Sequence, residues 1–463
     1  MTGLGAEAAT VQIPATGGAA RRAAGLPRLL PPVPGTSAVP ARGDAPPEPP
    51  EGLPAHLTRN GRPRYRGVAL IQAVKAAGLT GRGGAAFPAH VKLAAVAAQG
   101  GRKVVVANGA ESEPASEKDA ALLWHAPHLV LDGLQLAAEA VGASQAYLYL
   151  HQGRSSRLEE ALAERASQHP DRVGVMIVEA PPRFLAGQET AMTSRISGGP
   201  ALPTFGVPRV AERGVAGAPT LVQNVETLAH LALIARHGPR WFREAGTAAE
   251  PGTMLATIHE GHRPHVMELA IGTPLAEVLP RTTAADAGAI LVGGYHGTWL
   301  PASLLAGASS ASAASSASGE LALANAALSQ HQAALGAGVI AVLPKDVCGL
   351  REAARVTRYL AAESAGQCGP CLNGLPRIAG AMAELAGPRP RRQTRENVAR
   401  WSGLVTGRGA CHHPDGTVRF VRTALTVFAD ELRRHANGQC SATSREPFLP
   451  LPYGMPTSEE DWT

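Results

Sequence analysis

Residues 103–119 read KVVVANGAESEPASEKD. The first six form a short apolar run rich in β-branched side chains, which predicts a buried strand over 103–108. The surrounding segments alternate in pattern, with helices predicted at 67–78, 127–142 and 155–168 and further strands at 145–150 and 173–180. Alternation of this kind indicates an α/β layer built on a largely parallel sheet.

The rest of the chain divides by composition. Residues 1–50 are dominated by Ala, Pro and Gly and are predicted to be a disordered arm before an α/β domain at 51–248. Short strand-like runs between Gly and Pro turns predict a small β-rich domain at 249–340, in which 306–320 (AGASSASAASSASGE) is expected to be a mobile loop. Residues 341–440 have helical patterns, and 441–463 are interpreted as a tail.

Composition and charge exclude several classes of protein. The net charge of +6 comes without a clustered Lys/Arg run interleaved with aromatic residues, so no nucleic-acid partner is expected. No apolar run reaches the roughly 18 to 20 residues that span a bilayer, and the pair Arg21-Arg22 precedes no apolar export segment. We therefore expect a cytoplasmic location, with peripheral attachment to a membrane complex as one arrangement. Five cysteines in a chain of this length favour free, metal-binding or redox thiols over a disulfide framework.

A glycine-rich stretch, GLTGRGGAAFPAHVK at 78–92, precedes the strand at 103–108. Its glycines follow a helix, so they are not the dinucleotide fingerprint, which follows a strand. Glycines still allow positive φ angles and close approach of a ring or an anion to the backbone, and Pro88 suits the first turn of a helix. Lys92 lies about one turn further on, within reach of a phosphate. The alternative interpretation is a plain surface loop.

Polar side chains gather where the predicted strand ends. Asn108 is its last residue, and Glu111 and Glu113 follow immediately. Open α/β sheets bind ligands beyond the carboxyl ends of their strands. This placement favours a binding site formed by the glycine-rich stretch and these residues.

Six motifs stand in a fixed order between about 67 and 435: GLTGRGGAAFP with Lys92, NGAESEP with KD, GQETA, PTLVQNVETL, QCGPC and GRGAC. In this order they resemble the NADH-binding flavoprotein subunit of respiratory complex I and of related hydrogenases and formate dehydrogenases. The resemblance implies an FMN-binding α/β domain, a β-grasp domain like those that bind soluble ligands, and a C-terminal helical domain that holds a 4Fe-4S cluster. FMN, the cluster and NAD(H) are then the expected cofactors.

The same resemblance assigns residues to the site. It implies that Glu113 and Glu189 orient the donor and tune the flavin, and that Phe87 packs against the nicotinamide dinucleotide. The cofactor-binding residues that it implies are Gly81, Arg82, Gly83, Gly84, Phe87, Lys92, Asn108, Glu111, Glu113, Glu189 and Asn224. The alternative readings are a solvated charge for a lone Glu, a core position for Phe87 and a turn cap for Asn224.

The chain departs from the family pattern at several positions. Ala110 stands where the family has Asp, and Gln188-Glu189 stands where it has two Glu. Ala95 and Arg209 align with two aromatic residues that stack on the dinucleotide. The expectation of FMN is therefore better supported than that of NADH as the donor.

The cysteines form a second constellation. Cys368 and Cys371 have C-x-x-C spacing, which lets two thiolates face one centre, and Cys411 follows in GRGACHHPDG. The family places one more cysteine at position 365, where this chain has alanine. Cys348 is the predicted replacement, with a buried inert thiol as the alternative, whereas Cys440 is not expected to be a ligand. Zinc held by the three cysteines and His412 or His413 competes with the iron-sulfur cluster.

Taken together, these features predict an NADH dehydrogenase-like subunit, in which FMN accepts a hydride from NADH and single electrons leave through the 4Fe-4S cluster. The acceptor is expected to be a ferredoxin-like or thioredoxin-like 2Fe-2S carrier subunit or a quinone-reductase partner. Two alternatives remain open at this stage. In the first alternative, reduced ferredoxin replaces NADH as the electron donor. In the second, the chain is a cofactor-poor scaffold or sensor with the same fold.

Overall fold

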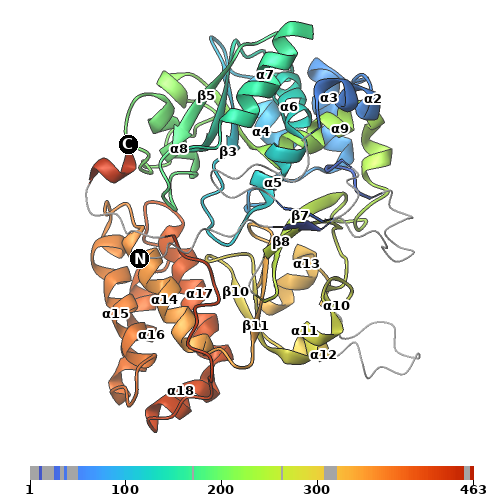
Figure 1. The fold of residues 1–463 in the computed structure, drawn as a ribbon. Coiled ribbons are helices and arrows are strands. Elements are labelled where there is room, and N and C mark those ends of the chain that lie inside the picture. The colour runs from blue at the N-terminus through green and yellow to red at the C-terminus, as the bar shows by residue number, and fades with distance from the viewer. Residues whose placement is uncertain are drawn as a thin grey trace.

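The structure is a computed structural model, and it describes residues 10–12, 26–31, 36–38, 51–168, 171–261, 264–306, 321–452 and 459–463. Figure 1 shows three regions: an α/β layer at the top, a mixed sheet at the lower right and a group of helices at the lower left. The predicted fold class is confirmed by this arrangement of a parallel sheet, a mixed sheet and a helical C-terminal region.

The upper sheet has four parallel strands in the order β5-β4-β3-β6. Their bounds are β3 Val104–Gly109, β4 Gln145–His151, β5 Val175–Ala180 and β6 Thr220–Asn224. The chain runs from β3 outward through β4 to β5, then returns to place β6 on the other side of β3. The strand order therefore reverses between β3 and β6, and a crevice forms beyond the carboxyl ends of such strands.

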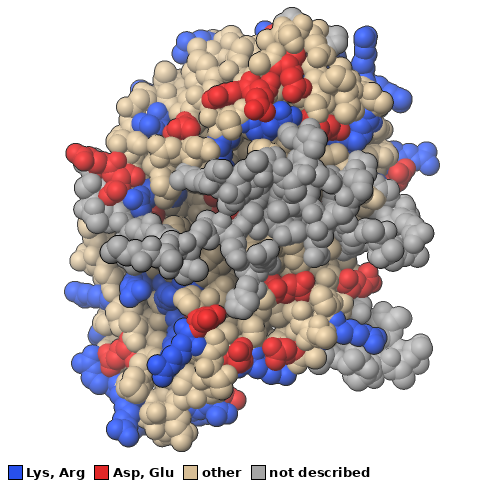
Figure 2. Space-filling view, in the orientation of Figure 1, with Lys and Arg blue, Asp and Glu red and all other residues tan. Residues whose placement is uncertain are grey.

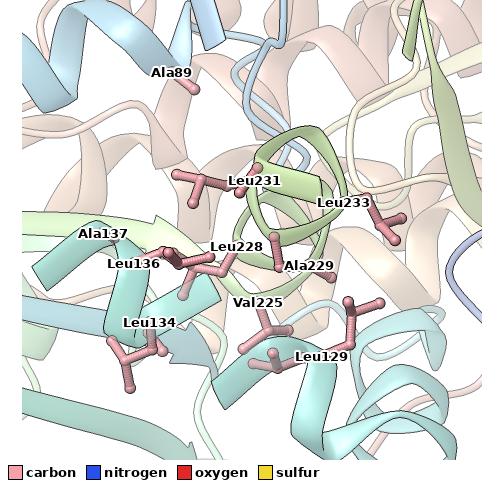
Figure 3. Packing of buried hydrophobic residues seen from close by; sticks show 14 of the residues in the cluster. Ala89, Leu129, Leu134, Leu136, Ala137, Val225, Leu228, Ala229, Leu231 and Leu233 are labelled. Carbon is pink, nitrogen blue, oxygen red and sulfur yellow. The ribbon is translucent and has the colours of Figure 1, made fainter. Parts of the chain in front are cut away.

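Helices cover both faces of this sheet. They are α2 Leu53–Asn60, α3 Gly67–Ala77, α4 Ala89–Ala97, α5 Lys118–His125, α6 Pro127–Val141, α7 Ser156–Gln168, α8 Glu189–Ile196, the short η1 Val215–Gly217 and α9 Val225–Phe242. α6 and α9 pack against each other, with side chains such as Leu134, Val225 and Leu228 between them (Figure 3). A Cβ at Gly133 would lie 2.0 Å from the carbonyl oxygen of Leu228, so glycine is what lets the two helices approach.

The second sheet has the order β10-β9-β11-β7-β8-β1-β2. Its strands are β1 Thr10–Gln12, β2 Thr36–Ala38, β7 Thr253–His259, β8 Pro264–Ala270, β9 Ala287–Val292, β10 Thr298–Pro301 and β11 Val339–Pro344. Its short helices are α10 Leu275–Val278, α11 Arg281–Asp286, α12 Ser303–Ala306, α13 Asn325–Leu328 and η2 Ser329–His331. β11 lies between β9 and β7, antiparallel to β9 and parallel to β7, so the sheet is mixed. The loop predicted at 306–320 lies, beyond residue 306, outside the described residues.

The C-terminal region consists of helices around a separate core. They are α14 Gly349–Ala362, a π-helical turn Pro370–Gly374 (η3), α15 Leu375–Leu385, α16 Arg392–Val405, α17 His413–Val427 and α18 Ala429–Ala436, and a last turn, η4, spans Glu459–Trp462. Leu350, Ile378 and Phe420 are fully buried in this core. Within the described ranges, no helix is long and apolar enough to cross a membrane.

Three expectations about domain limits need correction. The arm predicted at 1–50 is wrong for 26–31, because the backbone N–H groups of Arg28 and Leu29 donate to Glu268 at 2.8 and 2.9 Å and Leu29 is fully buried. This short apolar segment lies among prolines, so composition alone predicted that it would be disordered. β11 runs through the boundary predicted between 340 and 341. The predicted tail also packs in part, since Leu449 is buried and donates to Glu352 at 2.8 Å.

Candidate functional site

A cavity of about 290 Å³ lies at the carboxyl ends of β3 and β6, where the strand order reverses. It reaches from the glycine-rich loop to the cysteine-bearing start of α17. The residues that line it are Gly83, Asn108, Ala110, Glu111, Ser112, Glu113, Lys118, Asp119, Phe184, Leu185, Gly187, Gln188, Asn224, His296, Ala337, Cys411, His412 and His413. All three regions of the fold therefore contribute to one cavity.

Asn108 and Asn224 end the two strands beneath the cavity. Asn224 caps α9 by accepting from the N–H of Glu226 at 3.0 Å, and its amide donates to Asp119 at 2.6 Å. The Asn108 amide donates to the carbonyl of Gly187 at 3.0 Å. Both side chains thus hold the cavity walls together, and the cap predicted as the alternative role of Asn224 is present.

The glycine-rich loop is a closed turn, because the N–H of Gly81 donates to the carbonyl of Phe87 at 2.8 Å. Gly83 faces the cavity, and a Cβ there would lie 3.3 Å from the Cβ of Asn224. Gly84 has a φ of +108°, a conformation that side chains disfavour. The loop therefore presents bare backbone to the cavity, and this is the surface that a planar ring requires.

The side chain of Arg82 does not point into this cavity. It is buried, and its guanidinium donates to the carbonyls of Thr80 at 3.0 Å and Thr253 at 3.1 Å. The guanidinium therefore fastens the loop to β7, and the assignment of Arg82 to cofactor binding stays a prediction. Phe87 is 43% exposed and lies outside the cavity lining.

Glu111 and Glu113 line the cavity but are already bonded to the protein. Glu111 accepts from the backbone N–H groups of Lys118 and Asp119, both at 3.1 Å, and so caps α5. Burial, with the nearby carboxylate of Asp119, raises the pKa of Glu111 to about 8. Glu113 accepts from the N–H of Tyr295 at 2.8 Å, yet burial raises its pKa to about 7.

Lys92 and Glu189 form an ion pair of 3.2 Å between α4 and α8. Each side chain is about one-third exposed, at 33% and 37%, so the pair stands open to solvent. Gln188 caps α8 through its side-chain oxygen, which accepts from Thr190 at 2.8 Å. The glutamine that replaces a family glutamate is therefore used as a helix cap that lines the cavity.

Sequence reasoning missed several lining residues. Lys118 is buried and lies 2.5 Å from Asp119 and 3.0 Å from Glu226. Burial alone lowers the pKa of Lys118, but these two carboxylates and Glu111 outweigh it and raise the pKa. The KD dipeptide after NGAESEP was the available signal. Phe184 and His296, by contrast, lie in segments without a motif and were not foreseeable.

The rings of Phe184, His296 and His413 line the cavity together with Gly83 and Cys411. His296 Nε2 lies 3.0 Å from His413 Nδ1, and His413 Nε2 lies 2.8 Å from the carbonyl of Leu360. Burial lowers the pKa of His413 to about 4, so both imidazoles are neutral near pH 7. Phe184 packs edge-on against His296, with ring centroids 4.8 Å apart. Cys411 lies two residues before His413 in the sequence.

Cys368, Cys371 and Cys411 come together at the start of α17. Burial and the nearby Cys368 raise the pKa of Cys371 to about 12, and Cys411 also acts on it. Burial raises the pKa of Cys411, while the backbone N–H of His413 opposes the shift. A site at the N-terminus of a 15-residue helix favours thiolates once a metal is bound.

Cys348 does not join these three cysteines. It caps the start of α14, a helix of 14 residues or about 21 Å, whereas Cys368 follows the other end. Its sulfur lies 3.6 Å from His435 Nε2, in a group with Glu431 and Cys440. The prediction of Cys348 as the fourth ligand is therefore wrong, because the chain does not fold back to the three cysteines and Cys348 instead contacts His435 and Glu431.

Comparison with known proteins decides the family. Residues 74–233 match the Nuo51 FMN-binding domain, and residues 351–435 match the iron-sulfur binding region of NADH-ubiquinone oxidoreductase F. The chain is a member of the family of F-type subunits of NADH-quinone oxidoreductase. As an F-type subunit it is an oxidoreductase with an FMN-binding domain and an iron-sulfur binding region.

Similarity to other F-type subunits extends over most of the chain. The second F-type subunit of NADH-quinone oxidoreductase from Rhizobium meliloti is 28% identical over 385 residues, which cover 79% of this chain and 88% of that protein. The F-type subunit of Rickettsia bellii is 27% identical over 384 residues, 78% of this chain and 89% of the relative. The solved structure of an NAD+-reducing [NiFe]-hydrogenase in its H2-reduced state has a TM-score of 0.69 at 28% identity. The match covers 82% of this chain but 63% of that one.

The residues present fit both groups of an F-type subunit. The bare backbone at Gly83 and the cavity beside it fit the flat flavin of FMN. Cys368, Cys371 and Cys411 interact with one another and supply three thiolates, the ligand type that holds an iron-sulfur cluster.

Proposed function

We propose that this F-type subunit oxidises NADH through FMN and passes single electrons through its cluster to a 2Fe-2S carrier subunit. The observation that supports this proposal most directly is that Gly83 and Cys411 line the same cavity. When bound, FMN supplies the two-electron to one-electron conversion and the cluster supplies the exit. The chain itself supplies position, exclusion of water and electrostatics.

The residues around the cavity have separable tasks in this proposal. Gly83 admits the ring, Asn108 and Asn224 hold the floor rigid, and Lys92, which lies outside the cavity lining, offers a cation for phosphate. Glu113, with a pKa of about 7, places an ionisable group in the cavity at physiological pH. Phe184, His296 and His413 exclude water between the loop and Cys411 with neutral rings.

NADH is supported by exposed aromatic residues near the ion pair of Lys92 and Glu189. Phe87 directly precedes α4, which carries Lys92. Phe205 is 74% exposed and follows Thr204, whose N–H donates to Thr190 next to Glu189 at 2.8 Å. Exposed aromatic rings of this kind suit stacking on the dinucleotide. In this proposal Phe205 takes over part of the stacking that Ala95 and Arg209 lack.

The surface next to the cysteines supports a protein partner. Leu372, in the π-helical turn that carries Cys371, is 61% exposed, and Leu404 on α16 is 54% exposed. Exposed arginines surround them in sequence: Arg377, Arg395, Arg400 and Arg408. Figure 2 shows Lys and Arg gathered over the lower part of this face, where the C-terminal helices lie. An apolar patch with cationic neighbours suits an acidic electron carrier.

The proposal is tested with full-length protein purified without air. We expect flavin and iron-sulfur absorption in the visible spectrum, and bleaching of both on addition of NADH. Gly83→Val should weaken flavin binding at least about fivefold and lower flavin content accordingly, since an overpacked contact costs about 1–3 kcal/mol. Gly100→Val is the matched control, because a Cβ at Gly100 meets nothing within 4 Å.

The outcomes separate the alternatives. Colourless protein after reconstitution with FMN and iron would identify a scaffold. A coloured protein that reduced ferredoxin bleaches and NADH does not would identify the carrier-dependent donor. Retention of flavin by Gly83→Val would place the flavin elsewhere.

A further inference from the structure

A second group of metal-binding side chains lies apart from the cavity and its cysteines. Cys348, Glu431, His435 and Cys440 each place one ligand atom within 4.8 Å of the others. Three of the four side chains are buried, and Cys440 is half-buried. Neither the glycine loop nor the three cysteines of the cluster contributes to this group, and the proposed electron transfer makes no use of it.

The ligand atoms of this group lie close enough together to bind one metal ion. His435 Nε2 lies 3.1 Å from Glu431 Oε1 and 3.6 Å from the sulfur of Cys348. The same sulfur lies 4.0 Å from Glu431 Oε1. Ligands of one zinc ion, at about 2.0–2.3 Å from the metal, lie at most about 4.6 Å apart. The distances of 3.1–4.0 Å among Cys348, Glu431 and His435 fall within this limit, and Cys440 completes the group within 4.8 Å.

The surroundings orient the ligands toward this centre. His435 Nδ1 lies 3.1 Å from the carbonyl of Leu385, so it carries the proton and donates there, which leaves Nε2 as a lone pair facing the group. Glu431 is held by the backbone N–H of Ser441 at 2.9 Å and by the Ser441 hydroxyl at 2.5 Å. A carbonyl behind the histidine and donors behind the carboxylate are the usual outer contacts of a metal site.

One cation could be bound by several of these groups at once, because His435 Nε2 and Glu431 Oε1 lie 3.1 Å apart and the sulfur of Cys348 lies 3.6 Å from the same Nε2. The two cysteine sulfurs favour the metal, because soft thiolates with imidazole select zinc among common divalent ions.

We propose that Cys348, His435, Cys440 and Glu431 bind a structural Zn²⁺ ion. Cys348 precedes α14 directly after β11, and the other three ligands lie on α18 or just beyond it. Glu431 and His435 stand four residues apart on the same face of α18. The ion therefore ties the last helix of the iron-sulfur region to the point where the chain leaves the second sheet. All four positions are filled by side chains, as in structural zinc sites.

The test begins with the metal content of the full-length protein grown with both iron and zinc. We expect about one zinc per chain beside the iron, and X-ray absorption at the zinc edge should report two sulfur and two nitrogen or oxygen ligands. Absence of zinc overturns the proposal, as does a disulfide between Cys348 and Cys440 in the purified protein. Zinc with three sulfur ligands also overturns it, since that set matches Cys368, Cys371 and Cys411.

Variants locate the ion independently. His435→Ala and Cys440→Ser should lower zinc at least about tenfold while flavin and iron are retained. Cys411→Ser is the matched control, which should lose iron and keep zinc. The opposite pattern, with zinc lost from Cys411→Ser and kept in Cys440→Ser, rejects the site. If a variant fails to fold, the zinc content and ligand set of the unmodified protein decide the question alone.

Discussion

The carboxylate of Glu113, just beyond β3, accepts a hydrogen bond of 2.8 Å from the backbone N–H of Tyr295 in the turn between β9 and β10. This contact joins the two sheets across the cavity. A Cβ at the neighbouring Gly294 would lie 2.5 Å from a carboxylate oxygen of Glu113, so the two backbones are tightly apposed. The ionisable group is thereby held in place on the cavity wall.

Glu113→Gln should remove a pH-dependent step from NADH oxidation. Burial raises the pKa of Glu113 to about 7, so the folded protein holds this group neutral below pH 7 and ionised above it. The carboxylate favours the positive charge that develops on the nicotinamide as hydride leaves. We expect the rate of flavin reduction by NADH to rise about threefold to tenfold from pH 6 to 8, on the order of 1 kcal/mol.

Anaerobic stopped-flow measurements across this pH range test the effect. Glu113→Gln should stay at the low-pH rate throughout, whereas Glu117→Gln, outside the cavity lining, should keep the step. The effect of pH on stability has the opposite sign to its effect on the rate. A folded pKa above the unfolded value means that the contribution of Glu113 is fully present below about pH 4.5 and lost as pH rises through 7. An unchanged step in Glu113→Gln would assign the ionisation to another group.

Lys92→Met should weaken FMN or dinucleotide binding with little loss of stability. The Lys92–Glu189 pair is one-third exposed, and exposed pairs contribute about 0–1 kcal/mol. A charge-assisted bond to phosphate is worth about 1.5–3 kcal/mol, or roughly tenfold to a hundredfold in affinity. Titration of the flavin-free protein with FMN and then NADH measures both affinities. Lys75→Met on α3 is the control, and equal affinities in the two variants would remove Lys92 from the site.

Phe205→Ala should raise the KM for NADH without altering flavin content. Loss of aromatic stacking costs about 0.5–1.5 kcal/mol, or about twofold to tenfold. Val207 is equally exposed, at 74%, in the same segment, so Val207→Ala is a matched control for loss of exposed apolar surface. Steady-state kinetics with an artificial electron acceptor separate the two. The same KM in both variants would argue against stacking on Phe205.

Ala365→Cys should strengthen the iron-sulfur cluster. Cys371, Cys368 and Cys411 come together, and Ser364 hydrogen-bonds to Cys371, so residue 365 lies next to the group. Three thiolates leave one iron without a cysteine, and a fourth should slow the loss of iron to a chelator about tenfold or more. Iron analysis and electron paramagnetic resonance after oxidation measure this. Ala361→Cys, one turn earlier in α14, is the control that adds a thiol elsewhere.

Gly133→Ala should destabilise the α/β domain by about 3 kcal/mol. Its Cβ would lie 2.0 Å from the Leu228 carbonyl oxygen, so α6 and α9 must separate. Gly380→Ala in α15 is the matched helical control, because a Cβ there meets nothing within 4 Å, and it should stabilise by about 0.5–1 kcal/mol. Thermal unfolding followed by circular dichroism compares them. A Gly133→Ala protein as stable as the unmodified one would show that the helices can shift without cost.

Local sequence determined much of this protein. The valine run of β3, the polar residues at its end and the Cys368–Cys371 spacing each depend on neighbours in the chain, so periodicity and turn chemistry were sufficient to predict them. The order of the six motifs was sufficient to predict the family. The tertiary structure alone decided which distant groups meet: the guanidinium of Arg82 turned toward β7, Leu29 buried beside β8, Gly83 and Cys411 on one cavity, and Cys348 beside His435. Such contacts depend on how sheets and helices pack, and packing is set by shape and burial summed over the whole chain, which no short stretch of residues contains.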